Sequence, residues 1–201
     1  MAGARMRPAY PLWVTGPCAI FVAVLVPIYW HHHGPANFLW FSDIALFAVL
    51  ITLWTGDRLL PSMMAVGVLP FEILWMVDFA TAGQLMGITG YMFDPALPLF
   101  LRALSLFHVA IPPLLIWMLV RQGYDRRAVW AQTLLAWVVL PASWLLASPQ
   151  DNINGVYGPF DEPQTLLPPL VYLAGYMAIL PLAVHLPMHA LLRRLLPGPV
   201  S

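Results

Sequence analysis

The sequence predicts an all-α membrane protein, a polytopic bundle of six transmembrane helices that forms one domain over residues 1–201. Hydrophobic residues make up 61% of the chain and charged residues only 9%, far from the composition of a soluble domain. Six apolar runs also approach the ~20 residues that a helix needs to cross a bilayer. The links between these runs are short or rich in Pro and Gly, so no separate soluble domain fits between them.

The apolar runs follow one another from near the N-terminus to near the C-terminus. The first run is preceded by arginines and lacks a small-residue cleavage site, so we expect it to be retained as a membrane anchor. The third run contains Pro70, which predicts a kink beside Glu72. The predicted spans are residues 13–30, 38–56, 61–82, 98–120, 128–148 and 167–192.

The arginines predict the orientation, because loops that stay in the cytoplasm carry an excess of positive charge. When the chain is threaded through six membrane-spanning helices, every arginine except Arg102 falls on the same side of the membrane. We therefore expect both termini in the cytoplasm, the segments 31–37, 83–97 and 149–166 outside, and a multi-pass protein of a bacterial-type inner membrane. The arginines on the common side are Arg5, Arg7, Arg58, Arg121, Arg126, Arg127, Arg193 and Arg194.

Charge and cysteine content exclude other classes of protein. The formal net charge is zero, so no basic field predicts binding to nucleic acid. Cys18 is the one cysteine and has no partner in the chain for a disulfide.

Polar groups gather in the outer halves of three predicted spans. Counting inward at about 1.5 Å per residue places them roughly 6–15 Å below the outer face, with Glu72 and His108 both at about 15 Å. The inner halves of the same spans are almost entirely apolar. Because isolated polar groups in lipid turn inward and find partners, we expect a buried polar pocket that opens toward the outer leaflet. These groups are Ser42, Asp43, Glu72, Asp78, Arg102, Ser105 and His108.

Each of these groups has a structural interpretation beside a functional one. His108 is either a general base or a histidine that bonds neighbouring helices. Arg102 is expected to pair with a carboxylate, for which Asp43, Asp78 and Asp94 are the candidates. Glu72 lies so deep that it is a candidate for a protonated donor.

Ser42 is the candidate nucleophile. A serine near a helix start is most often a cap, but Asn37 is better placed for that role. Ser42 becomes reactive only beside a base. In the loop 149–166, Asn152 and Asn154 either fold back over the pocket as amide donors or belong to an ordinary surface turn.

Other histidines do not predict a metal or haem site. His31, His32 and His33 are consecutive, and neighbouring residues on an extended chain point in alternating directions. His185 and His189 have i, i+4 spacing, but they lie near the inner end of the last span, far from His108. We therefore expect no bound cofactor or metal.

Three sequence patterns suggest a family. FLWFSDIAL opens one helix, GYMFDPALPLFLRALSLFH leads into another, and DNINGVYG with PQTLLPPLVYL precedes the last span. Their order resembles the YwaF-like integral membrane proteins, which are similar in turn to animal lipid acyltransferases and androgen-induced fatty-ester hydrolases. The resemblance spans roughly residues 37–175.

The resemblance implies roles for individual residues. In the broader group a cysteine or threonine on an early helix pairs with a histidine on a later one. His108 matches that histidine, and Asn152 and Asn154 match the N-x-N pattern before the last helix. The chain departs from the family at the nucleophile, where Ser42 is the available substitute for the cysteine.

Three functions remain open. The first is intramembrane acyl transfer or ester hydrolysis on a membrane lipid. The second is a module that binds a cation or relays protons through carboxylates and imidazole. The third is a structural subunit whose polar groups hold helices together. In the first, Ser42 is the nucleophile, His108 the base, Asp43 or Asp78 orients the histidine, Asn152 or Asn154 stabilises the oxyanion, and Arg102 and Glu72 contact the substrate.

Overall fold

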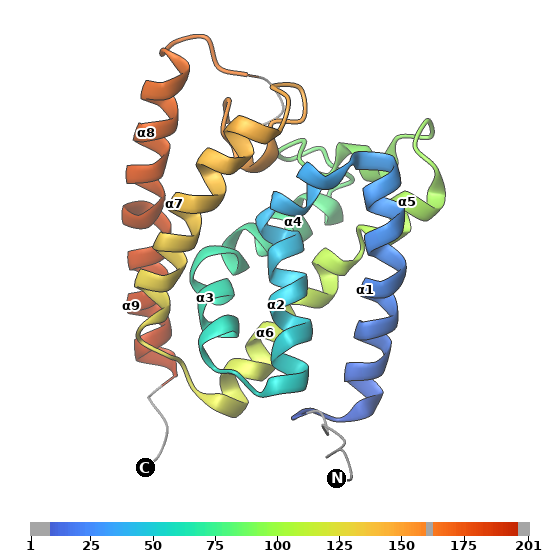
Figure 1. Ribbon diagram of the computed structural model, residues 1–201, viewed down its shortest axis with the longest axis vertical. Helices are drawn as coiled ribbons and strands as arrows, with labels where there is room; N and C mark the ends of the chain where they lie inside the picture. Colours follow the sequence, from blue (N-terminus) through green and yellow to red (C-terminus); the bar gives the residue numbers. More distant parts are fainter. Residues whose placement is uncertain (1–8, 160–162, 197–201) are drawn as a thin grey trace, which may run out of the picture.

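The computed structural model describes residues 9–159 and 163–196, and within them the chain is helical with no strand. The all-α prediction is thereby confirmed for this part of the chain. Short 3₁₀ turns occur at Pro35–Leu39, Gly90–Phe93 and Ile153–Gly155. The α-helices are α1 (Leu12–His33), α2 (Phe41–Thr55), α3 (Leu59–Gly67), α4 (Leu69–Ala80), α5 (Leu99–Leu104), α6 (Phe107–Gln122), α7 (Ala128–Leu146), α8 (Pro169–Leu180) and α9 (Leu186–Leu195), with a π-helical turn, Pro181–His185, between the last two (Figure 1).

Membrane-spanning length is reached by four helical segments of the described residues, or by five if the bent pair of α3 and α4 forms one span. The predicted span 38–56 corresponds to α2, whose 15 residues cover about 22 Å at 1.5 Å per residue. That is less than the ~30 Å hydrocarbon core of a bilayer. A multi-pass membrane protein is therefore supported, and the number of six spans stays a prediction.

The third predicted span is broken near its middle. Helices α3 and α4 meet at Val68 with a bend of 54°. Pro70 lies in the first turn of α4, where a backbone N–H would have no partner within the helix. The missing N–H of proline therefore loses no hydrogen bond, and Pro70 favours a helix start here. The kink predicted from Pro70 is confirmed, and it makes Glu72 a first-turn residue of a new helix.

The fourth predicted span is also interrupted, between α5 and α6. The Ser105 N–H is shared between the carbonyls of Leu101 (3.3 Å) and Arg102 (3.1 Å), and the His108 N–H bonds the Ser105 carbonyl. These shorter-range bonds are typical of a 3₁₀-like turn between helices. His108 consequently lies in the first turn of α6, as Glu72 does in α4.

A freed carbonyl explains one contact of the last span. Pro181 has no N–H, so the Met177 carbonyl loses its usual partner four residues ahead. The indole N–H of Trp137 donates to that carbonyl at 2.9 Å. This bond joins α7 to α8 at the point where the helix passes into the π-helical turn.

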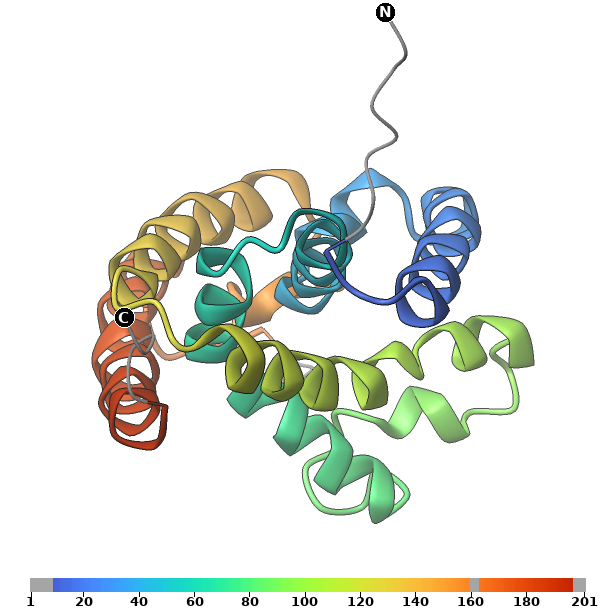
Figure 2. The same ribbon diagram turned by 90° about the horizontal axis from the view of Figure 1, so that it is seen from below.

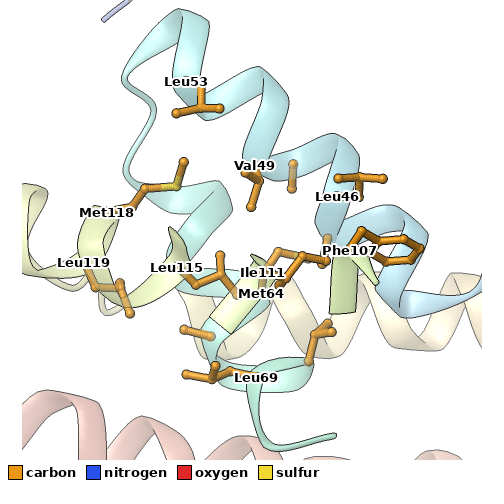
Figure 3. Close-up of a cluster of buried hydrophobic side chains, with 14 of the residues drawn as sticks. Leu46, Val49, Leu53, Met64, Leu69, Phe107, Ile111, Leu115, Met118 and Leu119 are labelled. Carbon is orange, nitrogen blue, oxygen red and sulfur yellow. The ribbon is translucent and has the colours of Figure 1, made fainter. Parts of the chain in front are cut away.

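The main core lies between α2, α3 and α6, beneath the polar residues. Figure 2 shows α3 between α6, α7 and α9, in agreement with its packing against all three. Figure 3 shows the cluster of buried side chains, which includes Leu46, Val49, Leu53, Met64, Leu69, Phe107, Ile111, Leu115, Met118 and Leu119.

Large apolar side chains also cover the outside of the bundle. Trp13, Trp130 and Leu145 are each at least 70% exposed. An outer surface of this kind is expected where helices face lipid. A smaller buried cluster joins α7 to α8 through Ala136, Leu140, Val156, Leu173 and Leu180.

The two ends of the bundle differ in charge. α1 begins and α9 ends at the lower end in Figure 1, where the α2–α3 and α6–α7 links also lie. Six described arginines belong to segments at that end, and Arg102 belongs to the opposite one. Arg5 and Arg7 lie outside the described residues. The clustering agrees with the predicted topology, and the assignment of this end to the cytoplasm stays a prediction.

Asp125 fixes the link between α6 and α7. Its N–H donates to Ser62 Oγ at 3.0 Å, and its carboxylate accepts from Arg127 Nη2 at 2.8 Å and lies 3.7 Å from Arg58 Nη2. The hydrogen-bonded Arg127 side chain holds the pKa of Asp125 below its usual value, although burial opposes this effect. The charged form of Asp125 therefore stabilises the fold.

We expect this contribution to depend on pH. Because the pKa of Asp125 is lower in the folded chain than the unfolded value of about 3.9, the stabilisation is present above about pH 4 and is lost as the pH falls through the folded pKa. The thermal unfolding midpoint in detergent, followed from about pH 6 to about pH 3, should fall less steeply in Asp125→Asn than in the parent. Identical slopes in the two proteins would contradict this role. The effect should be small, because Arg127 is largely exposed to solvent.

Candidate functional site

A cavity of about 550 Å³ lies where the predicted polar pocket was expected. Its walls come from α1, α2, α4, α5, α6 and α8, together with the turn at 35–40 and the loop at 152–155. The volume falls within the range of ~300–1,000 Å³ that is usual for small-molecule sites. The predicted site residues that line it are Ser42, Asp43, Glu72, Arg102, His108, Asn152 and Asn154.

Glu72 and His108 form the central contact of the cavity. His108 Nδ1 lies 2.7 Å from Glu72 Oε2, and the side chains are 14% and 3% exposed, respectively. An ionised Glu72 accepts this bond from Nδ1–H, which leaves Nε2 as the basic nitrogen, whereas the protonated Glu72 that the sequence also allowed would donate it to Nδ1. Both residues lie in the first turn after a helix break, which brings α4 and α6 together at this depth.

Two aromatic rings fix the plane of the His108 imidazole. Trp75 stacks on it with ring centroids 4.6 Å apart and an interplanar angle of 15°. Phe107 lies 4.3 Å away at 21°. Trp75 is one turn beyond Glu72 on α4, so one helix supplies both the hydrogen bond and the stacking contact. Trp75 was not predicted as a site residue, although its i, i+3 spacing from Glu72 places the two side chains on the same face of a helix.

The expectation that Asp43 or Asp78 orients the histidine is therefore wrong, because Glu72 occupies that position. The sequence did hold a signal for the correct pair. Counting residues along the spans placed Glu72 and His108 at the same depth, whereas Asp43 and Asp78 came out nearer the outer face.

Ser42 lines the same cavity as His108, but no hydrogen bond joins the two side chains. The two side chains were expected within hydrogen-bond distance or one water of it, and the structure has no direct bond between them. Its neighbour Asp43 is only 2% exposed. Asp43 Oδ2 accepts a long 3.4 Å bond from Asn37 Nδ2, and Asp43 Oδ1 has no hydrogen-bond partner among the described residues.

Arg102 pairs with no carboxylate within residues 9–159 and 163–196, which corrects the expected ion pair with Asp43, Asp78 or Asp94. Its Nη1 donates instead to the Met92 carbonyl at 3.1 Å. Two of the candidate acids are engaged elsewhere, since Asp94 Oδ1 accepts the Ala96 N–H and Asp78 binds the loop after α4. The long side chain reaches outward along the cavity wall toward that loop.

Asp78 has a structural role and does not line the cavity. Its carboxylate accepts the N–H of Met86 at 2.6 Å, the N–H of Thr89 at 2.8 Å and the hydroxyl of Thr89 at 2.8 Å. These three bonds fold the segment after α4 back onto the helix end. Asp78 is fully buried, which explains why it needs this full set of donors.

Asn154 holds the start of α2 from a distant loop. Its Oδ1 accepts the Phe41 N–H at 3.0 Å, which provides the cap that was expected from Asn37. Its Nδ2 donates to the Leu39 carbonyl at 2.7 Å and to Ser143 Oγ at 3.2 Å. Both amide hydrogens are therefore used within the fold, which argues against Asn154 as an oxyanion donor.

Asn152 shapes the same loop. Its Oδ1 accepts the Tyr157 N–H at 2.9 Å, and its Nδ2 donates to the Gly158 carbonyl at 2.9 Å. Asn152 and Asn154 both have positive φ, a conformation that asparagine tolerates better than most residues. The expected folding of this loop over the pocket is confirmed, since both asparagines reach the cavity wall.

A pair of hydroxyls lines the cavity one helical turn before His108. Tyr29 Oη and Ser105 Oγ lie 3.0 Å apart. Ser105 Oγ also lies 3.5 Å from the Leu101 carbonyl, to which it donates when Tyr29 donates to Ser105. When Ser105 donates to Tyr29 instead, the Tyr29 hydroxyl keeps its own hydrogen. Tyr29 was not predicted, because a tyrosine near the end of an apolar run looks like an ordinary interfacial residue.

His185 and His189 do not line this cavity, whereas His33 does. His185 Nδ1 is 3.0 Å from Thr133 Oγ1, and His189 Nδ1 is 2.7 Å from the Tyr124 hydroxyl, so the two bind different partners. Over residues 9–159 and 163–196, no three His, Cys, Asp or Glu side chains are grouped closely enough to hold a metal ion.

Comparisons with known proteins identify no relative: no protein-family model matches the chain, and none of the curated proteins or solved structures that were searched matches it either. The resemblance to the YwaF-like proteins therefore stays a prediction from the short sequence patterns.

Proposed function

We propose that the cavity catalyses intramembrane acyl transfer or ester hydrolysis on a membrane lipid. The observation that carries this proposal is the 2.7 Å bond between Glu72 and His108 in a largely apolar cavity. A carboxylate on Nδ1 fixes the histidine tautomer and stabilises the imidazolium that forms when Nε2 takes a proton. No added cofactor is required for this chemistry.

In the first half-reaction Ser42 Oγ attacks the acyl carbonyl while His108 Nε2 removes the hydroxyl proton. The new Oγ–C bond gives a tetrahedral intermediate, whose collapse breaks the ester C–O bond. His108 then donates its proton to the departing alkoxide. Because Ser42 and His108 are not hydrogen-bonded in this structure, they must approach each other when substrate binds.

In the second half-reaction the same histidine activates the acyl acceptor. Water gives hydrolysis, and the hydroxyl of a second lipid gives transfer. The oxyanion needs donors in both halves. Tyr29 takes this role in the proposal in place of the asparagines: when Ser105 Oγ donates to Tyr29 Oη, the Tyr29 hydrogen is left for the oxyanion, and only the long 3.5 Å bond from Ser105 to the Leu101 carbonyl is given up.

The proposal is tested with a long-chain fluorophosphonate, which forms a P–O bond to an activated serine and releases fluoride. We expect the parent protein to be labelled at Ser42, and Ser42→Ala and His108→Ala to lose labelling. Ser148→Ala is the matched control, since Ser148 lies on the exposed loop after α7. Labelling that survives both cavity substitutions would exclude Ser42 as the nucleophile.

Proton binding is the second candidate function, and the buried Asp43 favours it. Asp43 Oδ1 has no hydrogen-bond partner in the described part of the chain, and Glu72 and His108 line the same cavity. Proton release measured with a pH dye in liposomes tests this function. Asp43→Asn should abolish the signal if the function is proton transfer, and should leave it unchanged if the cavity is an acyl-transfer site.

A further inference from the structure

The helices that surround the cavity do not all pack closely against one another. α4 packs against α3 and α6, and α8 packs against α7, but α4 and α8 are not among the closely packed helix pairs of the described residues. Both nevertheless line the cavity, α4 through Phe71 and Leu74 and α8 through Tyr176 and Leu180. In the described part of the chain the cavity therefore has one side wall, between α4 and α8, along which these two helices are not closely packed.

Apolar side chains border this side wall. Phe71 is 42% exposed and Leu74 is 44% exposed, and both touch the cavity as well as the outer surface. In a bilayer these positions face hydrocarbon, so a lipid chain crosses the opening without leaving an apolar environment.

A second cavity of about 310 Å³ adjoins the first at the end of the bundle opposite the arginines. The two share His33, Asn37 and Trp40 as lining residues. We refer to the second cavity as the polar chamber, which is lined by His32, His33, Ala36, Asn37, Trp40, Asp151 and Ile153. Its imidazole, amide and carboxylate groups suit a hydrogen-bonding head and do not suit a hydrocarbon chain.

Asn37 connects the two regions. It lines both cavities and donates to Asp43, which lines the main cavity together with Glu72 and His108. A ligand that runs from the polar chamber to the gap between α4 and α8 therefore passes the Glu72–His108 pair.

We propose that the ligand is a single-chain amphiphile whose hydrocarbon chain enters between α4 and α8 and whose polar head occupies the polar chamber. This proposal depends on the proposed function in one respect only: cleavage of the ligand requires the ester that joins head and chain to lie at His108. The binding itself does not require turnover.

The experiment uses two photoactivatable probes with the purified full-length chain in nanodiscs. One probe is a monoacylglycerol with a diazirine near the end of its chain. The other is the methyl ester of the same acyl chain, which lacks the glycerol head. After irradiation, the labelled peptides are identified by mass spectrometry. We expect adducts of the monoacylglycerol to concentrate on residues 69–80 and 169–180.

Leu74→Trp fills the opening and should lower the yield of these adducts about tenfold, which corresponds to about 1.4 kcal/mol. Leu134→Trp is the matched control, since Leu134 on α7 is 64% exposed and does not line the cavity. Ala36→Trp should lower capture of the monoacylglycerol but not of the methyl ester. Both cavity variants should unfold at the temperature of the parent, which separates blocked entry from misfolding.

Two outcomes would overturn the proposal. One is an even spread of adducts over the lipid-facing helices, and the other is unchanged capture in Leu74→Trp. His108→Ala distinguishes binding from chemistry, because it should keep capture and lose turnover. Capture at the opening by a parent protein that turns over no ester would refute the catalytic function and leave this binding mode in place.

Discussion

Replacing Glu72 by glutamine is expected to lower ester turnover about 10³–10⁴-fold, the size of effect seen when a catalytic histidine loses the carboxylate that orients it. Glu72 Oε2 accepts from His108 Nδ1 at 2.7 Å and is almost fully buried, so no water replaces the lost charge. A neutral amide does not stabilise the imidazolium, and its NH₂ group also favours the wrong histidine tautomer. The measurement is turnover of a long-chain ester in nanodiscs.

Glu72→Asp is the matched variant, because it keeps the negative charge and shortens the side chain by one methylene. We expect its activity to lie between those of the parent and Glu72→Gln. The ¹⁵N chemical shifts of the His108 ring give a second readout that does not depend on turnover. They should report a proton on Nδ1 in the parent and a changed tautomer population in Glu72→Gln. Full activity in Glu72→Gln would refute the role of the pair.

Replacing Gly67 by alanine is expected to destabilise the protein by about 1–3 kcal/mol, the usual cost of adding an atom to a filled core. A Cβ at this position would lie 2.3 Å from Gln132 Nε2 and 2.6 Å from both Cδ and Cγ of the same side chain. Gln132 is only 1% exposed, and because Cγ and Cδ clash as well as the terminal Nε2, most of its buried side chain would have to shift. The thermal unfolding midpoint in detergent measures the effect.

Gly175→Ala on α8 is the control, since no atom lies within 4 Å of the added Cβ. It should be neutral or slightly stabilising, because alanine favours a helix more than glycine does. A double-mutant cycle of Gly67→Ala with Gln132→Ala should show an interaction between the two positions. Additive effects would mean that the clash with Gln132 is not the cause.

The same substitution should also reduce activity. Gly67 directly precedes Val68, where α3 ends and α4 changes direction, and Val68 lines the cavity. A shift of this bend would move Glu72, which lies in the first turn of α4. Loss of stability without any change in activity would indicate that the Glu72–His108 pair tolerates movement of the bend.

The sequence by itself determined the helical class and the level of the site along the bundle. Hydrophobic content and the length of the apolar runs are properties of local sequence, because a helix in lipid must satisfy its backbone bonds internally. The depth of each polar residue follows from the rise of the helix, which is why Ser42, Glu72 and His108 were correctly expected to share one cavity. Pro70 likewise predicted the break before Glu72 from local sterics alone.

Only the tertiary structure decided which polar groups meet. Residue counting gives depth but not rotation about the helix axis, and the break at Val68 turns the axis of one span while the 3₁₀-like turn at Ser105 interrupts another. Glu72 therefore faces His108, while Asp78 turns to the loop that follows it and Arg102 reaches a backbone carbonyl. The cap on α2 comes from Asn154, 113 residues beyond Phe41, and no local pattern contains that contact.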